Sequence, residues 1–259
     1  MKVLPHLGRI GRATRWRRVR GRPRVWGHRG DPAHAPENTM RSFERAIAAG
    51  ADGIELDVRL DGDGNVVVFH DDELARLIGR TGRMEQLSAA ERAALRVRGE
   101  PVPLLAEVLA AFDTDVNVEI KAARLGRAGA LVAAAAKVIK ASGRAERVLV
   151  SSFDPIALVQ LHRHLPDVAA AYLFHDEQAL PLRKGWAGRW AGASLVHPQH
   201  TLVSEASLAR WHRAGLAVNV WTVNDPAELR RLAALGADGV FTDDPAAALA
   251  VLAAPAAGS

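Results

Sequence analysis

Two carboxylates alternate with apolar side chains in one short stretch of the chain. Ile54, Leu56 and Val58 are apolar, and Glu55 and Asp57 stand between them. In an extended strand this alternation places both carboxylates on one face and the apolar side chains on the other. Because like charges held close together outside bulk water repel strongly, we expect a proton, a cationic side chain or a metal ion to neutralise the pair.

A second apolar run follows at residues 66–69, after the turn-forming cluster Asp-Gly-Asp-Gly-Asn. Such a cluster between two apolar runs predicts that the chain folds back as a β-hairpin. A return strand of this length would bring His70 to the level of Glu55 and Asp57. The sequence therefore predicts that two carboxylates and an imidazole converge at one place.

The elements that must position these side chains alternate from residue 24 onward. β-like runs occupy residues 25–27, 53–58, 117–120, 148–153, 169–174, 194–196, 217–223 and 239–242, and helical patterns occupy residues 39–49, 104–112, 126–141, 155–164, 204–214 and 226–235. Alternation of strand and helix predicts an α/β fold with a parallel sheet, and eight repeats favour a closed (β/α)8 TIM barrel. An open doubly wound sheet is the alternative, but no Gly-x-Gly-x-x-Gly turn follows the first strand.

The interval between the second and third predicted strands is longer than the others, so it must hold more than a crossover helix. We expect residues 71–103 to form a small insertion over one rim of the barrel. Ser88 is suited to cap a short helix at residues 89–95 within it. Insertions in barrels often lie beside the active mouth.

Polar side chains stand at the C-terminal ends of several predicted strands, where barrel enzymes place their catalytic residues. His28 and Arg29 follow the first strand, Glu119 and Lys121 end the third, and Trp221 ends the seventh. Together with the acidic pair of the second strand, they place three carboxylates and a lysine at one mouth, beside two histidines. Trp221 could be a core residue or an apolar wall for a substrate.

These residues belong to a set of motifs whose order resembles that of the glycerophosphodiester phosphodiesterases. The motifs are His28-Arg29-Gly30, Pro36-Glu37-Asn38-Thr39, residues 50–58, His70-Asp71, Glu119-Ile120-Lys121, Ser152-Phe153 and Trp221-Thr222-Val223-Asn224. The likeness covers roughly residues 24–248, and several motifs in order are far more specific than any one of them.

The resemblance implies a barrel enzyme that cleaves a glycerophosphodiester into sn-glycerol 3-phosphate and an alcohol with the help of a divalent cation. At the matching positions it implies metal ligands at Glu55, Asp57 and Glu119, catalytic histidines at His28 and His70, and phosphate or substrate contacts at Arg29 and Lys121. The residue types fit this chemistry on their own terms. Three carboxylates in a chain without cysteine suit Mg²⁺ or Ca²⁺ better than zinc, and two histidines suit the removal and delivery of a proton.

The net charge of +5 is unevenly distributed along the 259 residues. Residues 1–23 hold eight basic groups and no acid, which leaves 26 basic against 29 acidic residues in the rest of the chain. We expect residues 1–23 to be a disordered, solvated extension and residues 24–259 to form the barrel domain. The alternative for the extension is an arm that is attracted to nucleic acid or to anionic lipid.

The composition excludes several classes of protein. The absence of cysteine removes disulfides, thiolate zinc sites and cysteine nucleophiles, and it fits a reducing compartment such as the cytoplasm. No long uncharged apolar run is present, so we expect no membrane span. We also expect a small-molecule substrate and no nucleic-acid partner.

Structural interpretations compete with the functional ones at several positions. The acidic pair of the second strand could be salt-bridged to Arg59, and Glu119 could pair with Lys121. We interpret Asn38 and its neighbour Glu37 mainly as structural residues that cap the following helix and brace the first loop, with contact to the metal ligands as the alternative. His197, which follows a predicted strand, is interpreted as a structural histidine.

Three functions follow from these alternatives. The first is metal-dependent hydrolysis of water-soluble glycerophosphodiesters. The second is a lysophospholipase D-like reaction, which would use the same residues on a lipid substrate. The third is a non-catalytic phosphate or nucleic-acid binding protein. The presence of every expected polar group favours an enzyme, and the charge-rich insertion favours a soluble substrate.

Overall fold

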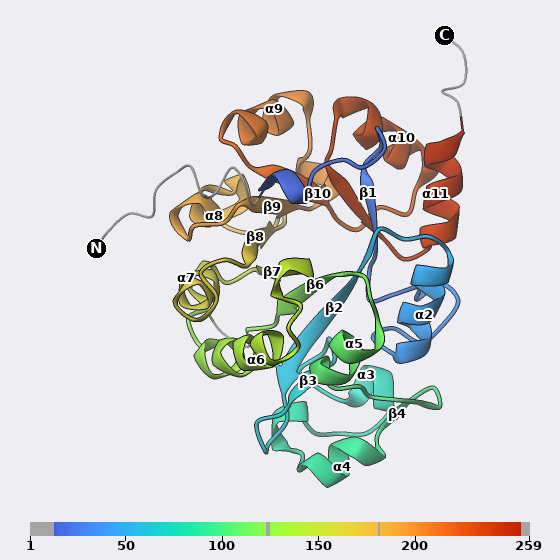
Figure 1. The fold of residues 1–259 in the computed structure, drawn as a ribbon, viewed down its shortest axis with the longest axis vertical. Coiled ribbons are helices and arrows are strands. Elements are labelled where there is room, and N and C mark those ends of the chain that lie inside the picture. Colours follow the sequence, from blue (N-terminus) through green and yellow to red (C-terminus); the bar gives the residue numbers. More distant parts are fainter. Residues whose placement is uncertain (1–12, 123–124, 181, 255–259) are drawn as a thin grey trace.

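The computed structural model describes residues 13–122, 125–180 and 182–254. Within these ranges, eight parallel strands form a closed ring with helices around its outside (Figure 1). The ring closes because β1 pairs with both β2 and β11. Its strands are β1 (Arg24–Gly27), β2 (Gly53–Leu60), β6 (Asp115–Ile120), β7 (Val148–Ser152), β8 (Ala169–Phe174), β9 (Leu195–Pro198), β10 (Ala217–Val220) and β11 (Gly239–Thr242). The predicted (β/α)8 TIM barrel is therefore confirmed.

Helices form at all six ranges where the sequence pattern predicts them. They are α2 (Met40–Ala48), α5 (Leu105–Ala111), α6 (Gly129–Ala141), α7 (Pro155–His164), α9 (Glu205–Arg213) and α10 (Pro226–Leu235). In the part of the barrel that the structure describes after residue 125, two helices were not predicted, α8 (Trp186–Trp190) and α11 (Pro245–Ala253). The first has only five residues, and the second is almost entirely apolar, so neither carries the two-faced periodicity on which such a prediction depends. Short 3₁₀ turns lie at η2 (Ala145–Arg147), η3 (Leu182–Lys184) and η4 (His200–Leu202).

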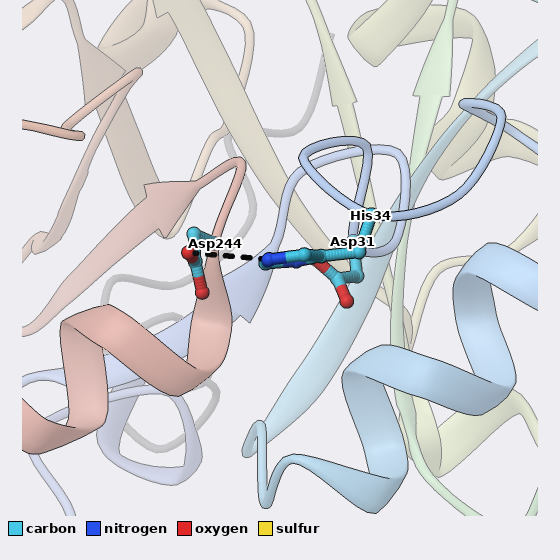
Figure 2. A group of neighbouring side chains, drawn as sticks. All are labelled: Asp31, His34 and Asp244. Atoms are coloured by element: carbon cyan, nitrogen blue, oxygen red, sulfur yellow. Dashed lines mark hydrogen bonds and ion pairs between the residues drawn. The ribbon is translucent and has the colours of Figure 1, made fainter.

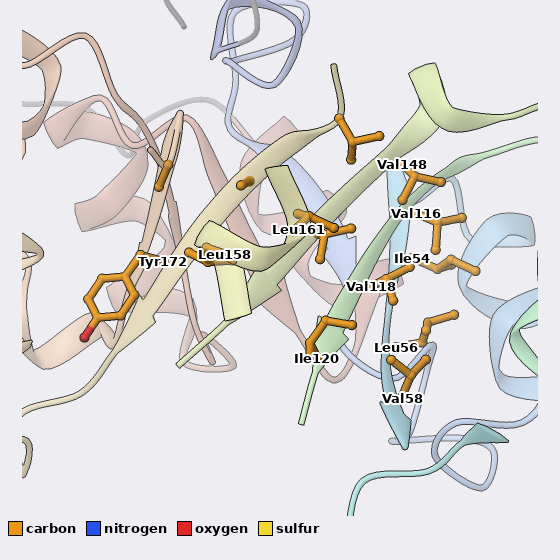
Figure 3. Close-up of a cluster of buried hydrophobic side chains, with 14 of the residues drawn as sticks. Ile54, Leu56, Val58, Val116, Val118, Ile120, Val148, Leu158, Leu161 and Tyr172 are labelled. Atoms are coloured by element: carbon orange, nitrogen blue, oxygen red, sulfur yellow. The ribbon is translucent and has the colours of Figure 1, made fainter. Parts of the chain in front are cut away.

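The apolar side chains of β2 and its neighbours point outward and pack against the surrounding helices (Figure 3). Ile54, Leu56 and Val58 are fully buried in this layer. Since side chains alternate along a strand, the same register turns Glu55 and Asp57 toward the barrel interior. Burial of one face of β2 thus fixes the direction of its two carboxylates.

The predicted hairpin is present. β3 (Val66–Val68) pairs antiparallel with the end of β2, with Val68 opposite Val58. The backbone N–H of Phe69 then donates to the carbonyl oxygen of Asp57 at 2.9 Å, which continues the pairing one step further. The next residue, His70, is thereby returned to the acidic pair, as the sequence predicts.

Residues 71–103 form the expected insertion, which extends from one side of the barrel, at the bottom of the view (Figure 1). It contains α3 (Ala75–Ile78), η1 (Met84–Gln86), α4 (Ala89–Ala94), β4 (Arg96–Val97) and β5 (Glu100–Pro101). Ser88 caps α4 as predicted, because its side chain accepts from the backbone N–H of Glu91. Phe69 and Leu74 belong to a separate apolar cluster that holds the insertion to the hairpin.

Residues 13–23 differ from the solvated extension that we expected. Trp16 is 2% exposed and stacks on Trp26 inside the barrel, with ring centroids 5.8 Å apart. Arg15 and Arg22 form ion pairs with Asp115 and Asp52 on the barrel. Burial of the apolar surface of Trp16 favours docking of this segment on the barrel over its solvation. Docking also brings its arginines close enough to the barrel acids to form the ion pairs. Residues 1–12 of the expected extension lie outside the described ranges.

Candidate active site

Three carboxylates meet inside the C-terminal end of the barrel. Glu55 and Asp57 come from β2 and Glu119 from β6, where the strand register sets Asp57 beside Glu119. All three are buried, and each offers one oxygen within 4.8 Å of the others'. Alternation along two neighbouring strands is sufficient to bring them together.

The electrostatics of this triad are unbalanced. Burial raises the pKa of Glu55 well above its usual range, and the neighbouring charges of Asp57 and Glu119 raise it further. Burial also acts to raise the pKa of Asp57, but the nearby Lys121 and Arg29 outweigh it and hold that pKa below its usual range. The buried Oδ1 of Asp57 has no hydrogen-bond partner among the described residues. A cation placed among these oxygens would relieve both the repulsion and the missing contact.

A loop before α2 holds Asp57 in place. The Asn38 side-chain amide donates to Asp57 Oδ2 at 2.9 Å and accepts from the Asp57 backbone N–H at 3.3 Å. Arg29 lies between acids, with Nη1 2.8 Å from Glu37 Oε1 and Nε 3.3 Å from Asp57 Oδ2. The capping role that we expected of Asn38 and Glu37 belongs to Thr39 alone, whose side chain accepts from the helix. Asn38 and Glu37 instead orient the site.

Arg29 and Asn38 also adopt an unusual backbone conformation. Their φ angles are 55° and 58°, in the left-handed region that non-glycine residues seldom occupy. Such conformations persist where surrounding contacts enforce them, and they cluster at functional sites. Here the backbone N–H of Arg29 donates to Glu55 Oε2 at 2.8 Å, a contact that fixes the loop against the triad.

Both candidate histidines are oriented by a carboxylate. His28 Nδ1 lies 2.7 Å from Asp243 Oδ1, and His70 Nδ1 lies 2.6 Å from Asp71 Oδ1. The carboxylate accepts a hydrogen bond from Nδ1–H, which leaves Nε2 of each ring to act as base or acid. Nε2 of His70 already faces Lys121, whose Nζ is 3.1 Å away.

Lys121 links the carboxylates to His70. Its Nζ is 2.8 Å from Glu119 Oε1 and 3.5 Å from Asp57 Oδ1. Burial would lower the pKa of Lys121, but these two acids outweigh it and raise that pKa. Burial lowers the pKa of His70, an effect that Asp57 opposes and Lys121 reinforces. The ammonium group of Lys121 is thus charged, and the imidazole favours its neutral form.

These groups surround one cavity of about 250 Å³. It is lined by His28, Arg29, Glu55, His70, Asn117, Glu119, Lys121, Phe153, Leu173, His197, Trp221 and Phe241. Seven of the eight residues singled out from the sequence are in this lining, and the eighth, Asp57, is buried behind it. The rings of Trp221 and Phe153 meet edge to face, with their centroids 5.5 Å apart, and form the apolar side of the cavity.

The competing interpretations are resolved by geometry at two positions. Arg59 does not neutralise the triad, because its guanidinium binds Asp72 and the carbonyl oxygen of His70. Glu119 and Lys121 do pair, and they line the cavity all the same.

Sequence reasoning missed several residues of the site. Asp243 was overlooked although it directly follows the last strand, a position that should have drawn attention to it. Asn224 donates to Asp243 Oδ2 at 2.6 Å and so helps to orient His28. His197, interpreted as structural, is fully buried and lines the cavity.

A second group of potential metal ligands lies nearby, at Asp31, His34 and Asp244 (Figure 2). His34 lies between the two carboxylates, with Nδ1 2.8 Å from Asp31 and Nε2 3.9 Å from Asp244. Asp31 is also paired with Arg45 at 3.0 Å. Because Arg45 already neutralises the carboxylate of Asp31, this group does not have the excess negative charge of the triad.

The chain matches the model of the glycerophosphoryl diester phosphodiesterase family over residues 28–247. It is 33% identical, over 232 residues, to a glycerophosphodiester phosphodiesterase of Caldanaerobacter subterraneus subsp. tengcongensis. The matched region covers 85% of this chain and 94% of the relative. No helix in the described ranges is long and apolar enough to cross a lipid bilayer.

Solved structures give the same answer. An Oleispira antarctica phosphodiesterase in complex with the product sn-glycerol-3-phosphate is similar with a TM-score of 0.81 and 28% identity, over 90% of this chain and 98% of that one. A glycerophosphodiester phosphodiesterase from Thermotoga maritima is similar with a TM-score of 0.72 and 30% identity, over 88% and 98%. By its family match, its relatives and its fold, this chain belongs to the glycerophosphoryl diester phosphodiesterase family.

Proposed function

We propose that this phosphoric diester hydrolase cleaves glycerophosphodiesters to sn-glycerol 3-phosphate and an alcohol with a divalent cation held by Glu55, Asp57 and Glu119. The observation that carries the proposal is the buried triad, with ligand oxygens within 4.8 Å of one another and one Asp57 oxygen lacking a hydrogen bond. Oxygen donors without sulfur or nitrogen suit Mg²⁺ or Ca²⁺. When bound, such an ion supplies charge neutralisation at the phosphoryl group.

His28 and His70 are the proposed proton carriers. One removes the proton of the attacking group, a water or a glycerol hydroxyl of the substrate, while the other protonates the leaving oxygen, and each is oriented through Nδ1 by its own carboxylate. The neutral form favoured at His70 is suited to accept a proton. The two imidazoles line the same cavity, as this division of tasks requires.

Arg29 and Lys121 are the proposed phosphate contacts. Both are charged, both line the cavity, and both are held in place by acids of the site. Arginine can donate two parallel hydrogen bonds to phosphate oxygens, and lysine acts as a point charge. Together they would position the diester against the triad.

The size of the cavity indicates that only a small part of the substrate enters it. Its volume of about 250 Å³ lies below the range of about 300–1,000 Å³ that is usual for drug-sized ligands. We infer that the glycerol phosphate half enters the cavity, that Trp221 and Phe153 flank it, and that the alcohol half remains at the mouth. The cysteine-free composition further supports a cytoplasmic enzyme.

The test is release of sn-glycerol 3-phosphate from glycerophosphocholine and glycerophosphoethanolamine in the presence of Mg²⁺, Ca²⁺ or a chelator. We expect release with one of the cations and its loss with chelator. A matched control is His34→Gln in the second acidic group, which should leave the metal response unchanged. Full activity in chelator after exhaustive metal removal would contradict the metal assignment.

A lysophospholipid is the second candidate substrate, favoured by one observation. Among the described residues, four large apolar side chains are more than half exposed: Leu125 after β6, and Leu180, Trp186 and Trp190 between β8 and β9. Exposed tryptophans of this kind are typical of proteins that touch a lipid interface. Lysophosphatidylcholine should be cleaved faster than glycerophosphocholine if this surface serves catalysis, and Trp190→Ser should then slow only the lipid reaction.

A further inference from the structure

A layer of polar side chains lies inside the barrel, at the floor of the catalytic cavity. Asn117 and Ser151 come from β6 and β7, and His197 and Asn219 come from β9 and β10. Each is at most 1% exposed. The valines adjacent to them in sequence belong to the outer apolar layer, so these four side chains point inward.

Hydrogen bonds within the layer leave two polar atoms without partners at the cavity. Asn117 Nδ2 donates to Ser151 Oγ at 3.0 Å, and Asn219 Nδ2 lies 3.4 Å from His197 Nε2. Among the described residues, Asn117 Oδ1 and His197 Nδ1 have no hydrogen-bond partner. Buried polar atoms are rarely left unpaired, so each of the two requires a partner that enters the cavity.

The amide of Asn219 determines which ring nitrogen of His197 carries the proton. Nδ2 of Asn219 lies 3.4 Å from Nε2 of His197, and an amide nitrogen can only donate. Nε2 of His197 therefore accepts, and Nδ1 carries the hydrogen.

The floor of the cavity thus offers one donor and one acceptor. The donor is Nδ1–H of His197 and the acceptor is Oδ1 of Asn117, and both residues line the cavity with Glu55 and Lys121. Burial lowers the pKa of His197 to about 3, so this floor carries no charge of its own. A neutral ligand group that both donates and accepts is complementary to it, and a hydroxyl is such a group.

We propose that His197 and Asn117 form a hydroxyl-binding floor that holds the terminal free hydroxyl of the substrate's glycerol while its phosphate lies at the triad. This inference rests on the proposed function and adds the substrate-specificity residues to it. It accounts for a polar layer at a depth where barrels usually carry branched apolar side chains. His197 and Asn117 are positioning and specificity residues here, since the reacting phosphorus lies elsewhere.

The test compares two substrates in the same protein. Glycerophosphocholine carries both free glycerol hydroxyls. The diester of choline phosphate with the terminal oxygen of propane-1,2-diol, called the propyl diester here, keeps the hydroxyl beside the phosphoester and lacks only the terminal one. His197→Leu removes the donor at similar volume, and His197→Asn keeps an N–H where Nδ1 stood. We expect kcat/KM for glycerophosphocholine, divided by that for the propyl diester, to fall about tenfold in His197→Leu and to be largely retained in His197→Asn.

Asn117→Ala provides a second route should His197→Leu fail to fold, and it is expected to lower the same ratio about tenfold. Equal losses on both substrates in these variants would mean a merely structural layer and would overturn the inference. So would an unchanged ratio, which would mean that ordered water satisfies the floor. The proposed function fails separately, if wild-type protein cleaves neither glycerophosphocholine nor glycerophosphoethanolamine.

Discussion

Strand β6 begins at Asp115 and approaches its end at Glu119, and these two buried carboxylates have opposite surroundings. Asp115 lies at the N-terminal end of the barrel, where Arg15, Arg24 and Arg147 lie 2.8, 3.1 and 3.4 Å from it. Glu119 lies at the other end, in a group of three carboxylates with one lysine and one arginine. One end is saturated with cations and the other is short of them.

The apolar parts of the two ends differ in the same way. Trp16, Trp26 and Phe241 stack in series from the N-terminal half toward the cavity and belong to one apolar cluster. The C-terminal half encloses the catalytic cavity and several unpaired polar atoms. We infer that the ion pairs and stacked rings of the N-terminal end stabilise the barrel, which allows the other end to keep the repulsion and the unpaired groups that binding requires.

The largest expected effect separates the two acids by function. Glu55→Gln should lower kcat/KM at least about 10³-fold, since several kcal/mol of charge stabilisation would be lost. In chelator the same variant should melt at a higher temperature, because it removes the buried carboxyl whose pKa is raised by burial and by repulsion from the neighbouring acids. Asp115→Asn, its counterpart at the other end, should melt lower and keep kcat. Equal activity losses in the two variants would abolish the distinction.

His28→Ala tests the proton transfer. We expect a loss in kcat of about 10²–10⁴-fold with little change in stability, because the side chain contributes acid or base chemistry. Asp243→Asn, which should only disturb the orientation of the ring, is expected to cost about tenfold. Steady-state kinetics on glycerophosphocholine measures both, and a larger loss in Asp243→Asn than in His28→Ala would reverse their proposed roles.

Trp16→Ala tests the N-terminal end of the barrel, where we expect a substitution to affect stability but not catalysis. Removing a buried tryptophan is expected to lower the free energy of unfolding by about 3–5 kcal/mol. At temperatures where the variant stays folded, kcat should match that of wild type, because the cavity lies at the opposite end. Denaturant titration measures the first quantity. A stability within about 1 kcal/mol of wild type would show that this segment does not close the barrel.

The smallest expected effect concerns pH. Burial lowers the pKa of His197 from 6.5 to about 3, with no acid beside it to compensate. Between these values the unfolded chain binds a proton that the folded chain does not, so the free energy of unfolding falls as the pH drops below 6.5. The loss is about 2 kcal/mol at pH 5. His197→Asn should show a shallower dependence in denaturant titrations at pH 5 and 7, and an identical slope would contradict it.

The alternation of eight β-like runs with helical patterns predicted the barrel, and the alternation of side chains within one run predicted the directions of Glu55 and Asp57. A short hairpin sufficed to predict the return of His70. The contacts that could not be predicted are those between residues far apart in the sequence. His28 and Asp243 are 215 positions apart, and no local pattern predicts that they touch. The burial of Trp16 was not predicted, because the many arginines around it suggested a solvated segment. Its partner Trp26 lies on the inward face of a strand, and that face is defined only once the barrel is closed.

The central claim is that the three carboxylates bind a divalent cation, and calorimetric titration of Mg²⁺ and Ca²⁺ into metal-stripped protein tests it most directly. We predict one site per chain in wild type and in Asp115→Asn, and no measurable binding in Glu55→Gln. Binding in Glu55→Gln with the affinity of wild type, or no binding in wild type, would contradict the claim.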